Sequence, residues 1–359
     1  MTRLWTTGYE TGDVAESGVS TVGAAQTLTV VGSTPTPRAG SYCLKLAAAA
    51  GAFNTVTSKA FAFGSNKTDV WLRFAFYVHG LPSGSEGTIV LWNDSAGSAQ
   101  CSLGFWPSDG LLRVHRGGST ATTVIATASA ALTQDAWHAI EMRYQITSAT
   151  VGIVEVWLDG TRVVNFSGDA AATANVNVLS VLLGALFTAS ASTGMTGVYY
   201  AFDDIAINDT AGSVNNGRAG DGRVVLLSPT GAGSNSGLTR GGTDTGANWS
   251  QTSELPPSLT QYVFGATAAL RDTYALGDLP VTPASISAVE VIALAQNNDA
   301  GAGSLGLTVK SSSTTNEGTA QALGTSAAYL RQLYETDPAT STAWTAAGVN
   351  ALEAGVTVR

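Results

Sequence analysis

Apolar and polar residues alternate with a period of two along most of the first 208 residues. Residues 69–79, for example, read DVWLRFAFYVH, in which every second residue from Val70 to Val78 is apolar. Successive side chains of a β-strand point to opposite faces, so this alternation predicts strands with one face on a core. Gly, Asn, Asp and Ser, which favour turns, separate these stretches. The pattern predicts an all-β fold.

The clearest pair of strands lies at residues 140–146 (IEMRYQI) and 154–160 (VEVWLDG). The short sequence TSATVG joins them, which predicts an antiparallel hairpin whose apolar face lies on the core. Its other face would bring Arg143 close to Glu155 or Trp157, as a charge pair or a cation–π pair.

The alternation stops at residues 208–222, which read NDTAGSVNNGRAGDG, and resumes afterwards. Small and polar residues of this kind are typical of linkers and long surface loops. We therefore predict a first domain at 1–209, a linker at 210–222 and a second, smaller β-sandwich at 223–359 that serves attachment or oligomerisation. Strands are expected at 223–229, 258–267, 271–276, 286–296 and 303–312. Thr345 is expected to cap a short C-terminal helix that runs to Leu352 and ends by Gly355.

Composition narrows the possible partners. Only 12% of the residues are charged and the net charge is −9, with 17 Lys and Arg spread along the chain. Binding of nucleic acid requires clustered basic residues, so no nucleic-acid partner is expected. No apolar stretch approaches the length of about 18 residues that spans a membrane. Cys43 and Cys101 are expected to be buried thiols, and a bridge between them stays open.

The hairpin also carries a resemblance to a known fold. The residues AWHAIEMRYQI and GIVEVWLDGTRVVNFSG resemble the central hairpin of concanavalin A-like, laminin-G-like jelly rolls. The segments TGYETGD, near the N-terminus, and YAFDDIAIND, ending at Asp209, resemble the paired first and last strands of such sandwiches. This resemblance implies a jelly roll for residues 1–209, but it specifies function poorly because many functions share the fold.

The whole chain resembles the two-part structural proteins of tailed bacteriophages. The resemblance rests on a composition rich in Gly, Ala, Ser and Thr and on the order of the segments. This resemblance implies a non-enzymatic virion protein, either a capsid decoration protein or a component of a tail fibre or receptor-binding device. It also implies a place on the virion surface, a homo-oligomer such as a trimer, other virion proteins as partners, and host-surface carbohydrate as a ligand.

Catalytic residues do not stand out in the sequence. Sandwich glycosidases resemble this fold and carry Glu-x-Asp-x-x-Glu on one strand, which is absent here. Glu155 and Asp159 come nearest, but four residues of strand separate them by about 13 Å, whereas a retaining glycosidase needs about 5–5.5 Å. His138 lacks an accompanying Ser or Cys nucleophile motif. The sequence therefore predicts that the protein is not an enzyme.

Sugar binding is a further candidate activity. Aromatic faces with nearby charged and amide groups are typical of sites for small polar ligands. The candidate glycan face consists of Arg143, Glu155, Trp157, Trp92 and Asp94, with Asn93 and Trp106 as further candidates. Each Trp has an alternative role in core packing or in a subunit interface.

Two adjacent acids interrupt the strand-like segment YYAFDDIAIND. Strict alternation would direct either Asp203 or Asp204 towards the core. The jelly-roll resemblance implies a structural calcium site formed by Glu10, Asp203 and Asp204, with Asp13 as a further candidate, and calcium prefers such oxygen ligands. The alternative is that the buried acid accepts hydrogen bonds from backbone N–H groups or pairs with an Arg such as Arg3.

Two other functions stay open. A carbohydrate-binding module or a glycosidase of a bacterial surface system would use the same fold and the same aromatic and charged face. A purely architectural scaffold would have no ligand.

Overall fold

The computed structural model describes residues 2–24, 26–48, 57–83, 86–118, 123–185, 196–243 and 245–359. The chain divides into two compact units, Met1–Val224 and Val225–Arg359. In both units the regular secondary structure is nearly all β-strand, which confirms the predicted all-β fold of a jelly roll followed by a smaller β-sandwich. The boundary between them falls after Val224, beyond the segment 210–222 that the sequence assigns to a linker.

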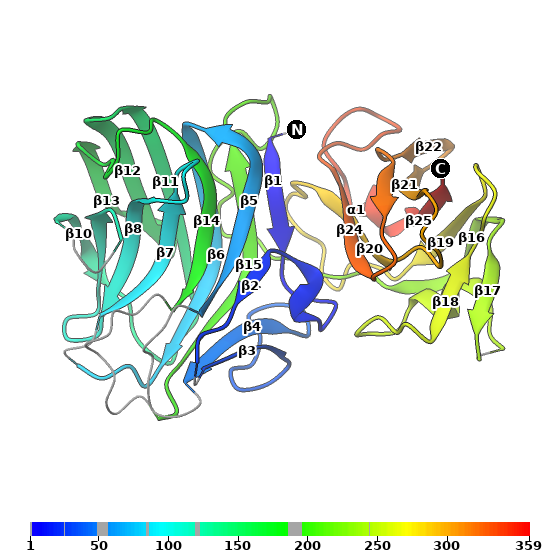
Figure 1. Ribbon diagram of the computed structural model, residues 1–359, viewed down its shortest axis with the longest axis horizontal. Helices are drawn as coiled ribbons and strands as arrows, with labels where there is room; N and C mark the ends of the chain where they lie inside the picture. Colours follow the sequence, from blue (N-terminus) through cyan, green and yellow to red (C-terminus); the bar gives the residue numbers. More distant parts are fainter. Residues whose placement is uncertain are drawn as a thin grey trace. The chain divides into compact units, whose positions relative to one another are not determined.

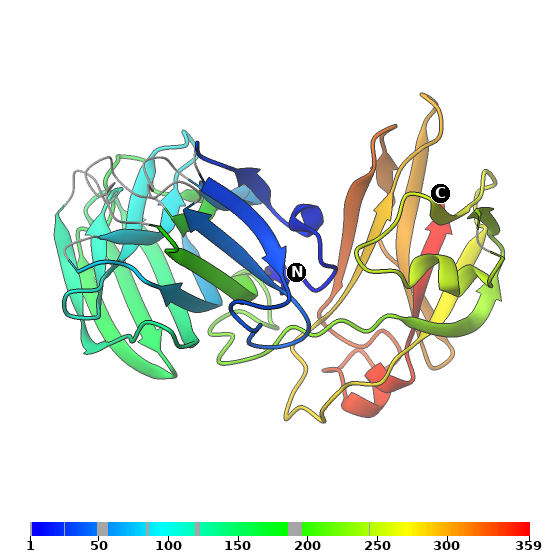
Figure 2. The same ribbon diagram turned by 90° about the horizontal axis from the view of Figure 1, so that it is seen from below.

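The first unit is a sandwich of two antiparallel sheets that face each other (Figures 1 and 2). Sheet A has the order β13-β12-β11-β6-β15-β4-β3, with β1 also paired to β15. Its strands are β1 (Arg3–Thr7), β3 (Gln26–Val31), β4 (Cys43–Ala48), β6 (Asp69–His79), β11 (His138–Ser148), β12 (Val151–Leu158), β13 (Thr161–Gly168) and β15 (Tyr199–Asp209).

Sheet B has the order β10-β9-β8-β7-β14-β5-β2. Its strands are β2 (Val19–Thr21), β5 (Thr57–Lys67), β7 (Gly87–Asn93), β8 (Ala99–Trp106), β9 (Leu111–Arg116), β10 (Val124–Ala131) and β14 (Val178–Ala185). A 3₁₀ turn, Val14–Glu16, precedes β2, and the side chain of Asp13 caps it by accepting a hydrogen bond from Ala15 N.

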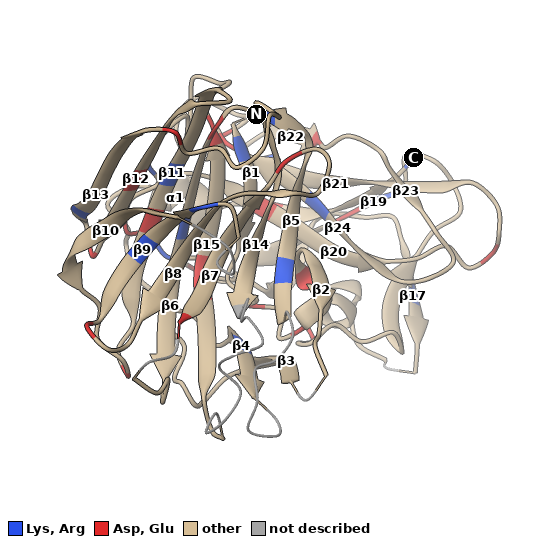
Figure 3. Cartoon of the chain, turned by 60° about the vertical axis from the view of Figure 1, so that its left-hand side comes forward, with Lys and Arg blue, Asp and Glu red and all other residues tan. Residues whose placement is uncertain are grey.

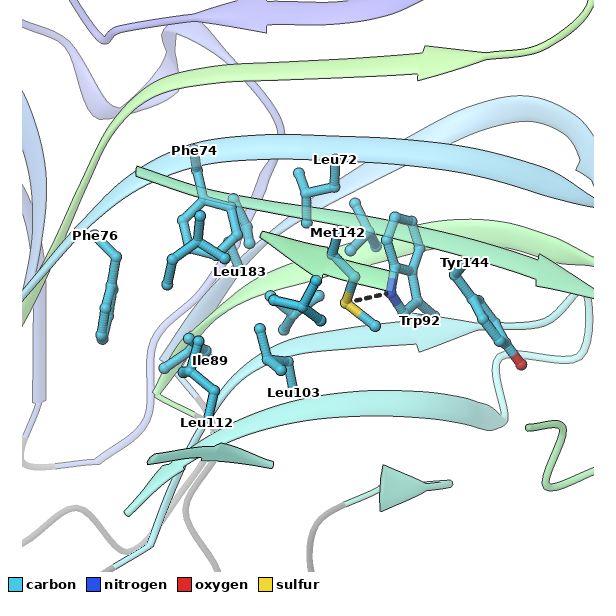
Figure 4. Packing of buried hydrophobic residues seen from close by; sticks show 14 of the residues in the cluster. Leu72, Phe74, Phe76, Ile89, Trp92, Leu103, Leu112, Met142, Tyr144 and Leu183 are labelled. Atoms are coloured by element: carbon cyan, nitrogen blue, oxygen red, sulfur yellow. Dashed lines mark hydrogen bonds between the residues drawn. The ribbon is translucent and has the colours of Figure 1, made fainter. Parts of the chain in front are cut away.

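The apolar faces of both sheets form one core, as the alternation predicts. Phe74 and Met142 of sheet A pack against Leu103 and Leu183 of sheet B (Figure 4). Trp92 lies among them with no exposed surface, and its Nε1–H donates to Met142 Sδ at 3.4 Å. Because the inner-face side chains of both sheets fill this core, the side chains on the outer faces do not contribute to it.

Strand pairing follows the predicted register in the hairpin of β11 and β12, where Arg143 lies opposite Glu155. The first and last strands of the unit also pair, with Thr7 opposite Ile205. The segment GYETGD lies just beyond β1 rather than inside it. Cys43 and Cys101 are both buried and free, so they are not bridged.

A β-bulge in β15 changes the expected orientation of the two acids. Tyr200 and Phe202 face the core before the bulge, and Ile205 and Ile207 face it afterwards. The pairing with β6 shifts between Asp203 and Ala206, and Asp204 has a φ of 54°. One inserted residue restores the apolar side to the core, so neither carboxylate points inward, contrary to the expectation from strict alternation.

The segment 210–224, which we call the returning segment, is held on the outer face of sheet A. Glu141 of β11 accepts hydrogen bonds from Arg218 Nε at 2.6 Å, Ala219 N at 2.6 Å and Gly220 N at 3.2 Å. Val224 N donates to Asp204 Oδ1 at 2.7 Å. These contacts explain why this polar, glycine-rich stretch belongs to the first compact unit.

The second unit contains a six-stranded sheet of order β16-β19-β25-β21-β22, with β23 paired to β21, and two two-stranded sheets, β17-β18 and β20-β24. Its strands are β16 (Pro229–Ser236), β17 (Thr239–Gly242), β18 (Gln261–Phe264), β19 (Arg271–Leu276), β20 (Val289–Ala295), β21 (Gly303–Ser311), β22 (Thr314–Glu317), β23 (Gln321–Leu323), β24 (Ala328–Tyr334) and β25 (Glu353–Val358). A 3₁₀ turn spans Asn248–Thr252.

The core of this unit joins the strands to the short helix α1 (Ala346–Asn350). Leu307 and Val309 of β21 pack there with Trp344, Val349 and Leu352. Thr345 caps α1 by accepting a hydrogen bond from Gly348 N at 3.0 Å, as predicted.

Two local predictions for this unit differ from the structure. The helix stops at Asn350, before the predicted end, because the chain continues into β25. Residues 223–228 form no strand despite their apolar sequence, and the strand begins at Pro229. Among the described residues, no helix is long and apolar enough to cross a membrane.

Candidate functional site

Charged residues are sparse on the strands (Figure 3), and several of them meet on the outer face of sheet B. The centre of this group is Gly104 of β8, which lies opposite Thr88 of β7 and Arg113 of β9. A Cβ at Gly104 would lie 2.9 Å from Trp106 Cζ3 and 3.3 Å from Glu86 Oε1. The absence of a side chain at Gly104 therefore lets Trp106 and Glu86 close over the strand. We call this group the Gly104 site.

Glu86, which directly precedes β7, is the titratable group of the Gly104 site. Burial raises its pKa to about 7, although the nearby Arg113 acts in the opposite direction. His115 Nε2 lies 3.6 Å from Glu86 Oε1. A carboxyl group with a pKa near neutrality can both hold and release a proton at neutral pH, which is what a general acid–base requires.

Trp106 and Arg113 form the more accessible side of the site. The guanidinium of Arg113 lies 4.6 Å from the centre of the Trp106 ring, and that ring stacks on His115 with centroids 5.2 Å apart. Arg113 Nη2 donates a hydrogen bond to Asp109 Oδ2 at 2.5 Å, which holds the guanidinium in place. An arginine next to an aromatic ring offers a fixed positive charge beside an apolar surface, a combination suited to an anionic sugar.

Polar groups with little solvent contact surround this pair. Thr88 and Ser102 lie on the same outer face, since they pair with Gly104 and His115. Within the part of the chain that the structure describes, the Oγ atoms of both residues are buried and have no hydrogen-bond partner. The site is therefore polar but largely dry, which strengthens electrostatic interactions inside it.

Three of the residues assigned to the glycan face from the sequence do lie together, on the outer face of sheet A. Arg143 binds both oxygens of Asp69, at 3.0 and 2.7 Å, and also contacts Glu155 at 3.3 Å. Trp71 and Trp157 pack with centroids 5.4 Å apart. These groups satisfy one another, and the returning segment places Arg218 over the Trp157 ring at 4.6 Å.

The other two residues assigned to the glycan face have different roles. Trp92 belongs to the core and has no exposed surface, so it is not available to a ligand. The buried carboxylate of Asp94 accepts hydrogen bonds from Ala96 N, Ser98 N, Thr173 Oγ1 and Asn175 Nδ2, all at 2.8–2.9 Å. Asp94 therefore fastens the loop after β7 to the segment around Thr173.

The carboxylates of Asp203 and Asp204 are satisfied by donors from two loops. Asp203 Oδ2 accepts from Arg38 N at 2.9 Å and Ala39 N at 3.3 Å. Asp204 pairs with the Arg38 side chain at 3.3 Å and accepts from Val224 N. Burial raises the pKa of both carboxyls, most directly because it disfavours their charged forms. The sequence offered backbone N–H groups or an arginine such as Arg3 as the alternative to a metal. The structure shows backbone N–H groups and an arginine, but the arginine is Arg38.

The described residues contain no group of three or more His, Cys, Asp or Glu side chains placed to hold a metal. Glu10 Oε2 accepts from Ser41 N at 2.7 Å, while its buried Oε1 has no hydrogen-bond partner in the described part of the chain. The calcium site at Glu10, Asp203 and Asp204 stays a prediction. Asp13 serves as the cap of the first 3₁₀ turn.

His138 and Asp159 form a local structural pair at the end of the central hairpin. His138 Nδ1 lies 2.7 Å from Asp159 Oδ2, and Asp159 Oδ1 accepts from Ala139 N at 2.8 Å. Asp159 has a φ of 48° and Gly160 a φ of 84°, as in the tight Asp-Gly turns that close hairpins.

Comparison with protein families decides the class of this protein. The family described as polysaccharide lyase matches residues 9–200, which is more than half of the chain. The chain belongs to the polysaccharide lyase family. The matched region of this polysaccharide lyase family member lies within its first unit and includes every residue of the Gly104 site.

Comparison with solved structures finds proteins of low similarity. The endo-β-1,4-glucuronan lyase from the fungus Trichoderma reesei is 15% identical over 58% of this chain and 95% of its own, with a TM-score of 0.44. The cellulose-induced protein Cip1 is 17% identical over 61% of this chain and 100% of its own, with a TM-score of 0.45.

The PL-14 alginate lyase from Aplysia kurodai is 12% identical over 58% of this chain and 99% of its own, with a TM-score of 0.41. At these values, the structural similarities support no inference about function. No curated protein matches the chain.

Family membership corrects two predictions made from the sequence. A non-enzymatic virion structural protein, as a capsid decoration or a tail fibre, is the wrong reading, because the matched family is one of carbohydrate-active enzymes. The prediction that the protein is not an enzyme is wrong for the same reason. The rival class, a carbohydrate-active protein, is the better description, and carbohydrate is the partner class that the family indicates. The homo-oligomer stays a prediction.

Sequence reasoning missed most of the Gly104 site. Only Trp106 was a candidate, while Glu86, His115 and Arg113 were not singled out. In LLRVHR, Arg113 and His115 alternate with the core residues Leu112 and Val114, so the period of two already places both on an outer face. Their meeting with Glu86 depends on the pairing of three strands, which no local pattern contains.

Proposed function

We propose that this protein is a lyase for an acidic polysaccharide and that the Gly104 site carries out the reaction. The observation that carries the proposal is the placement of Glu86, with its pKa of about 7, beside Arg113, Trp106 and His115. The match of the polysaccharide lyase family to this unit supports it.

A lyase breaks the bond between C4 and the glycosidic oxygen of a uronic acid residue by β-elimination. A base removes the proton on C5, a double bond forms between C4 and C5, and the C4–O bond breaks. The departing oxygen takes up a proton, so no water is consumed. The enzyme must therefore stabilise the negative charge that develops next to the uronate carboxylate, and it must move one proton.

The residues of the Gly104 site match these tasks. Arg113 binds the uronate carboxylate and stabilises the charge that develops when the C5 proton leaves. Ionised Glu86 takes the C5 proton and delivers it to the departing oxygen, which one group can do when both lie on the same side of the sugar ring. Trp106 offers an apolar surface for the sugar, and His115 positions the Glu86 carboxylate.

Substitution of Glu86 tests the proposal. Glu86→Gln keeps the size of the side chain but cannot accept a proton, so we expect kcat on uronic acid polymers to fall at least about 100-fold. The assay follows the absorbance of the new C4–C5 double bond. In the wild-type protein Glu86 must be ionised to act, so kcat/KM should be low below pH 6 and rise through about pH 7.

Glu155→Gln is the matched control, because Glu155 is a partly buried glutamate on the outer face of the other sheet. It should leave the rate unchanged. Full activity of Glu86→Gln, or a loss of activity in Glu155→Gln instead, would place the reaction on another part of the molecule.

A further inference from the structure

A second group of aromatic and charged side chains lies on the outer face of sheet A, away from the Gly104 site. It consists of Lys45, Tyr77, His79, Trp137 and Tyr199, and we call it the Tyr199 cluster. None of these residues takes part in the proposed reaction, and the hydrogen bonds and ion pairs of the described residues join none of them to the returning segment. They come from three neighbouring strands, β4, β15 and β6, and from the residue before β11.

Strand register places these side chains around one small residue. Ala201 of β15 lies opposite Lys45 on one side and Tyr77 on the other, and Tyr199 lies opposite His79. Residues that are directly opposite share a face of the sheet. Ala201 has no exposed surface, so the larger side chains around it cover this part of the face.

The rings pack in a continuous row. The rings of Tyr199 and Tyr77 are nearly parallel, at 5°, with centroids 5.9 Å apart, and His79 stacks on Tyr199 at 4.9 Å. Trp137 extends the row, with its ring 5.5 Å from that of Tyr77. Trp137 Nε1 donates to Thr36 O at 2.8 Å, which fixes the orientation of its ring.

Positive charge accompanies the rings. Lys45 Nζ lies 4.0 Å from the centre of the Tyr199 ring and donates to Thr34 O at 2.8 Å. His79 Nδ1 lies 2.5 Å from Asp135 Oδ1, while 46% of the His79 side chain stays exposed. Lys45 has no carboxylate partner among the ion pairs of the described residues, so its charge is available to an anionic ligand.

The core does not need these aromatic residues, because they lie on the opposite side of their strands from Val78, Tyr200 and Phe202. Tyr199 is only 8% exposed and supports the other rings from below, whereas Tyr77, His79 and Trp137 are partly exposed. Partly exposed aromatic rings beside a cation are typical of surfaces that bind ligands with both apolar and charged parts. A uronic acid polymer has this chemistry, since each sugar has an apolar ring face and a carboxylate.

We propose that the Tyr199 cluster is a non-catalytic binding surface for a chain of the same acidic polysaccharide, a role that rests on the proposed function. Sugar rings pack against the partly exposed Trp137 and Tyr77, and Lys45 binds a carboxylate. The net charge of −9 repels an acidic polymer, so a local cation beside the rings is required to hold it.

The position of the cluster predicts which substrates it affects. The Gly104 site and the Tyr199 cluster lie on the outer faces of the two opposed sheets. A short oligosaccharide cannot reach both, whereas a long polymer that is held at one face stays concentrated near the other. The cluster should therefore lower KM for polymer and have no effect on short substrates.

Affinity electrophoresis through gels that contain alginate or polyglucuronate measures the binding, with hydroxyethylcellulose as an uncharged comparison. In a Glu86→Gln background, we expect Trp137→Ala and Lys45→Met each to weaken retention by the acidic polymers about ten-fold. The effect of Lys45→Met should disappear at high salt, because it removes a charge. Tyr262→Ala is the matched control, since Tyr262 is an exposed aromatic residue of the second unit.

Cleavage assays with position 86 intact complete the test. Both cluster variants should raise KM for polymer about ten-fold and leave kcat/KM for a uronate tetrasaccharide unchanged, with melting temperatures like that of the wild type. Unchanged retention in both variants overturns the proposal and leaves the Gly104 site unaffected. If instead the cluster variants stop cleavage of the tetrasaccharide and Glu86→Gln does not, the Tyr199 cluster is the reaction site and the proposed function of the Gly104 site fails.

Discussion

At the scale of single residues, surroundings decide what a carboxylate does. Glu86 and Glu16 are both glutamates next to strands of the first unit. Glu16 is buried but accepts hydrogen bonds from Thr7 Oγ1, Thr11 N and Thr11 Oγ1 at 2.6–2.9 Å, which is a structural role. Glu86 Oε1 has no hydrogen bond in the described part of the chain, and the pKa of Glu86 is raised to about 7. This carboxyl group can therefore exchange a proton near neutral pH.

The sequence predicts such differences poorly, because they depend on partners that are distant along the chain. Asp94 follows a strand and precedes a turn, which is also where a ligand-binding acid would lie. Its partner Thr173 is 79 residues away. Trp92 is likewise a core residue only because Met142 and Tyr144 of the opposite sheet pack against it.

Gly104→Ala tests the geometry of the proposed site at this scale. The new Cβ would lie too close to Trp106 and within 3.3 Å of Glu86 Oε1, so both side chains must move. Displacement of a catalytic group by about 1 Å can reduce the rate roughly 100-fold. We expect a loss of that order in kcat on acidic polymers, with a normal far-ultraviolet circular dichroism spectrum. Unchanged kinetics would show that the positions of Trp106 and Glu86 over β8 do not matter for the reaction.

The predicted calcium site also belongs to this scale. If a calcium ion at Glu10, Asp203 and Asp204 stabilises the fold, addition of a chelator should lower the melting temperature, and Glu10→Gln should remove that response. Thermal unfolding with and without chelator measures both. A wild-type melting temperature that does not change on chelation would contradict calcium and leave Arg38 and the backbone donors as the full account of these acids.

At the scale of elements, alternation of apolar and polar residues predicts a strand well where the strand it pairs with also alternates and lies close in the sequence. The hairpin of β11 and β12 has its predicted register because two alternating stretches and a short turn specify it locally. Residues 223–228 also look like a strand but form none, since Val224 pairs with Asp204 through its backbone instead of entering a ladder. An apolar run alone does not provide a pairing partner.

The second unit shows the same contrast between local and distant signals. Thr345 caps α1 as predicted, because a cap and its N–H donor are only three residues apart. The end of the helix depends on β25, whose pairing with β19 and β21 takes up the residues from Glu353 onward. Tertiary pairing therefore overrides the weak local preference for more helix.

At the scale of the whole molecule, the composition and the order of segments led to a wrong assignment of function. Few charges, many small residues and a jelly roll are shared by virion proteins and by carbohydrate-active enzymes, because these features describe a rigid β-sandwich. The reacting groups contribute little to composition, since the Gly104 site needs only a handful of charged and aromatic residues. The fold was therefore predictable from pattern, while the function was not.

The boundary of the first unit gives a prediction at this scale. A fragment of residues 1–209 lacks the returning segment, so Glu141 loses Arg218, Ala219 and Gly220, and Asp204 loses Val224. Hydrogen bonds to charged groups contribute about 1.5–3 kcal/mol each. We expect the 1–209 fragment to melt at least about 5 °C below a fragment of residues 1–224. Equal melting temperatures, measured by differential scanning calorimetry, would show that 210–224 is only a connection.

The bulge in β15 has a consequence for which changes in chain length the protein tolerates. Asp204 is the inserted residue that shifts the second half of the strand by one position, so that Ile205 and Ile207 reach the core. Removal of that one residue would restore strict alternation, so Phe202, Ile205 and Ile207 would still face the core along the strand that joins β1 to the rest of sheet A. A deletion at position 204 would remove one carboxylate with its contacts to Arg38 and Val224 N, whereas a deletion of Ile205 or Ile207 would remove a core side chain. Single-residue deletions should therefore be tolerated better at position 204 than at the isoleucines that follow it.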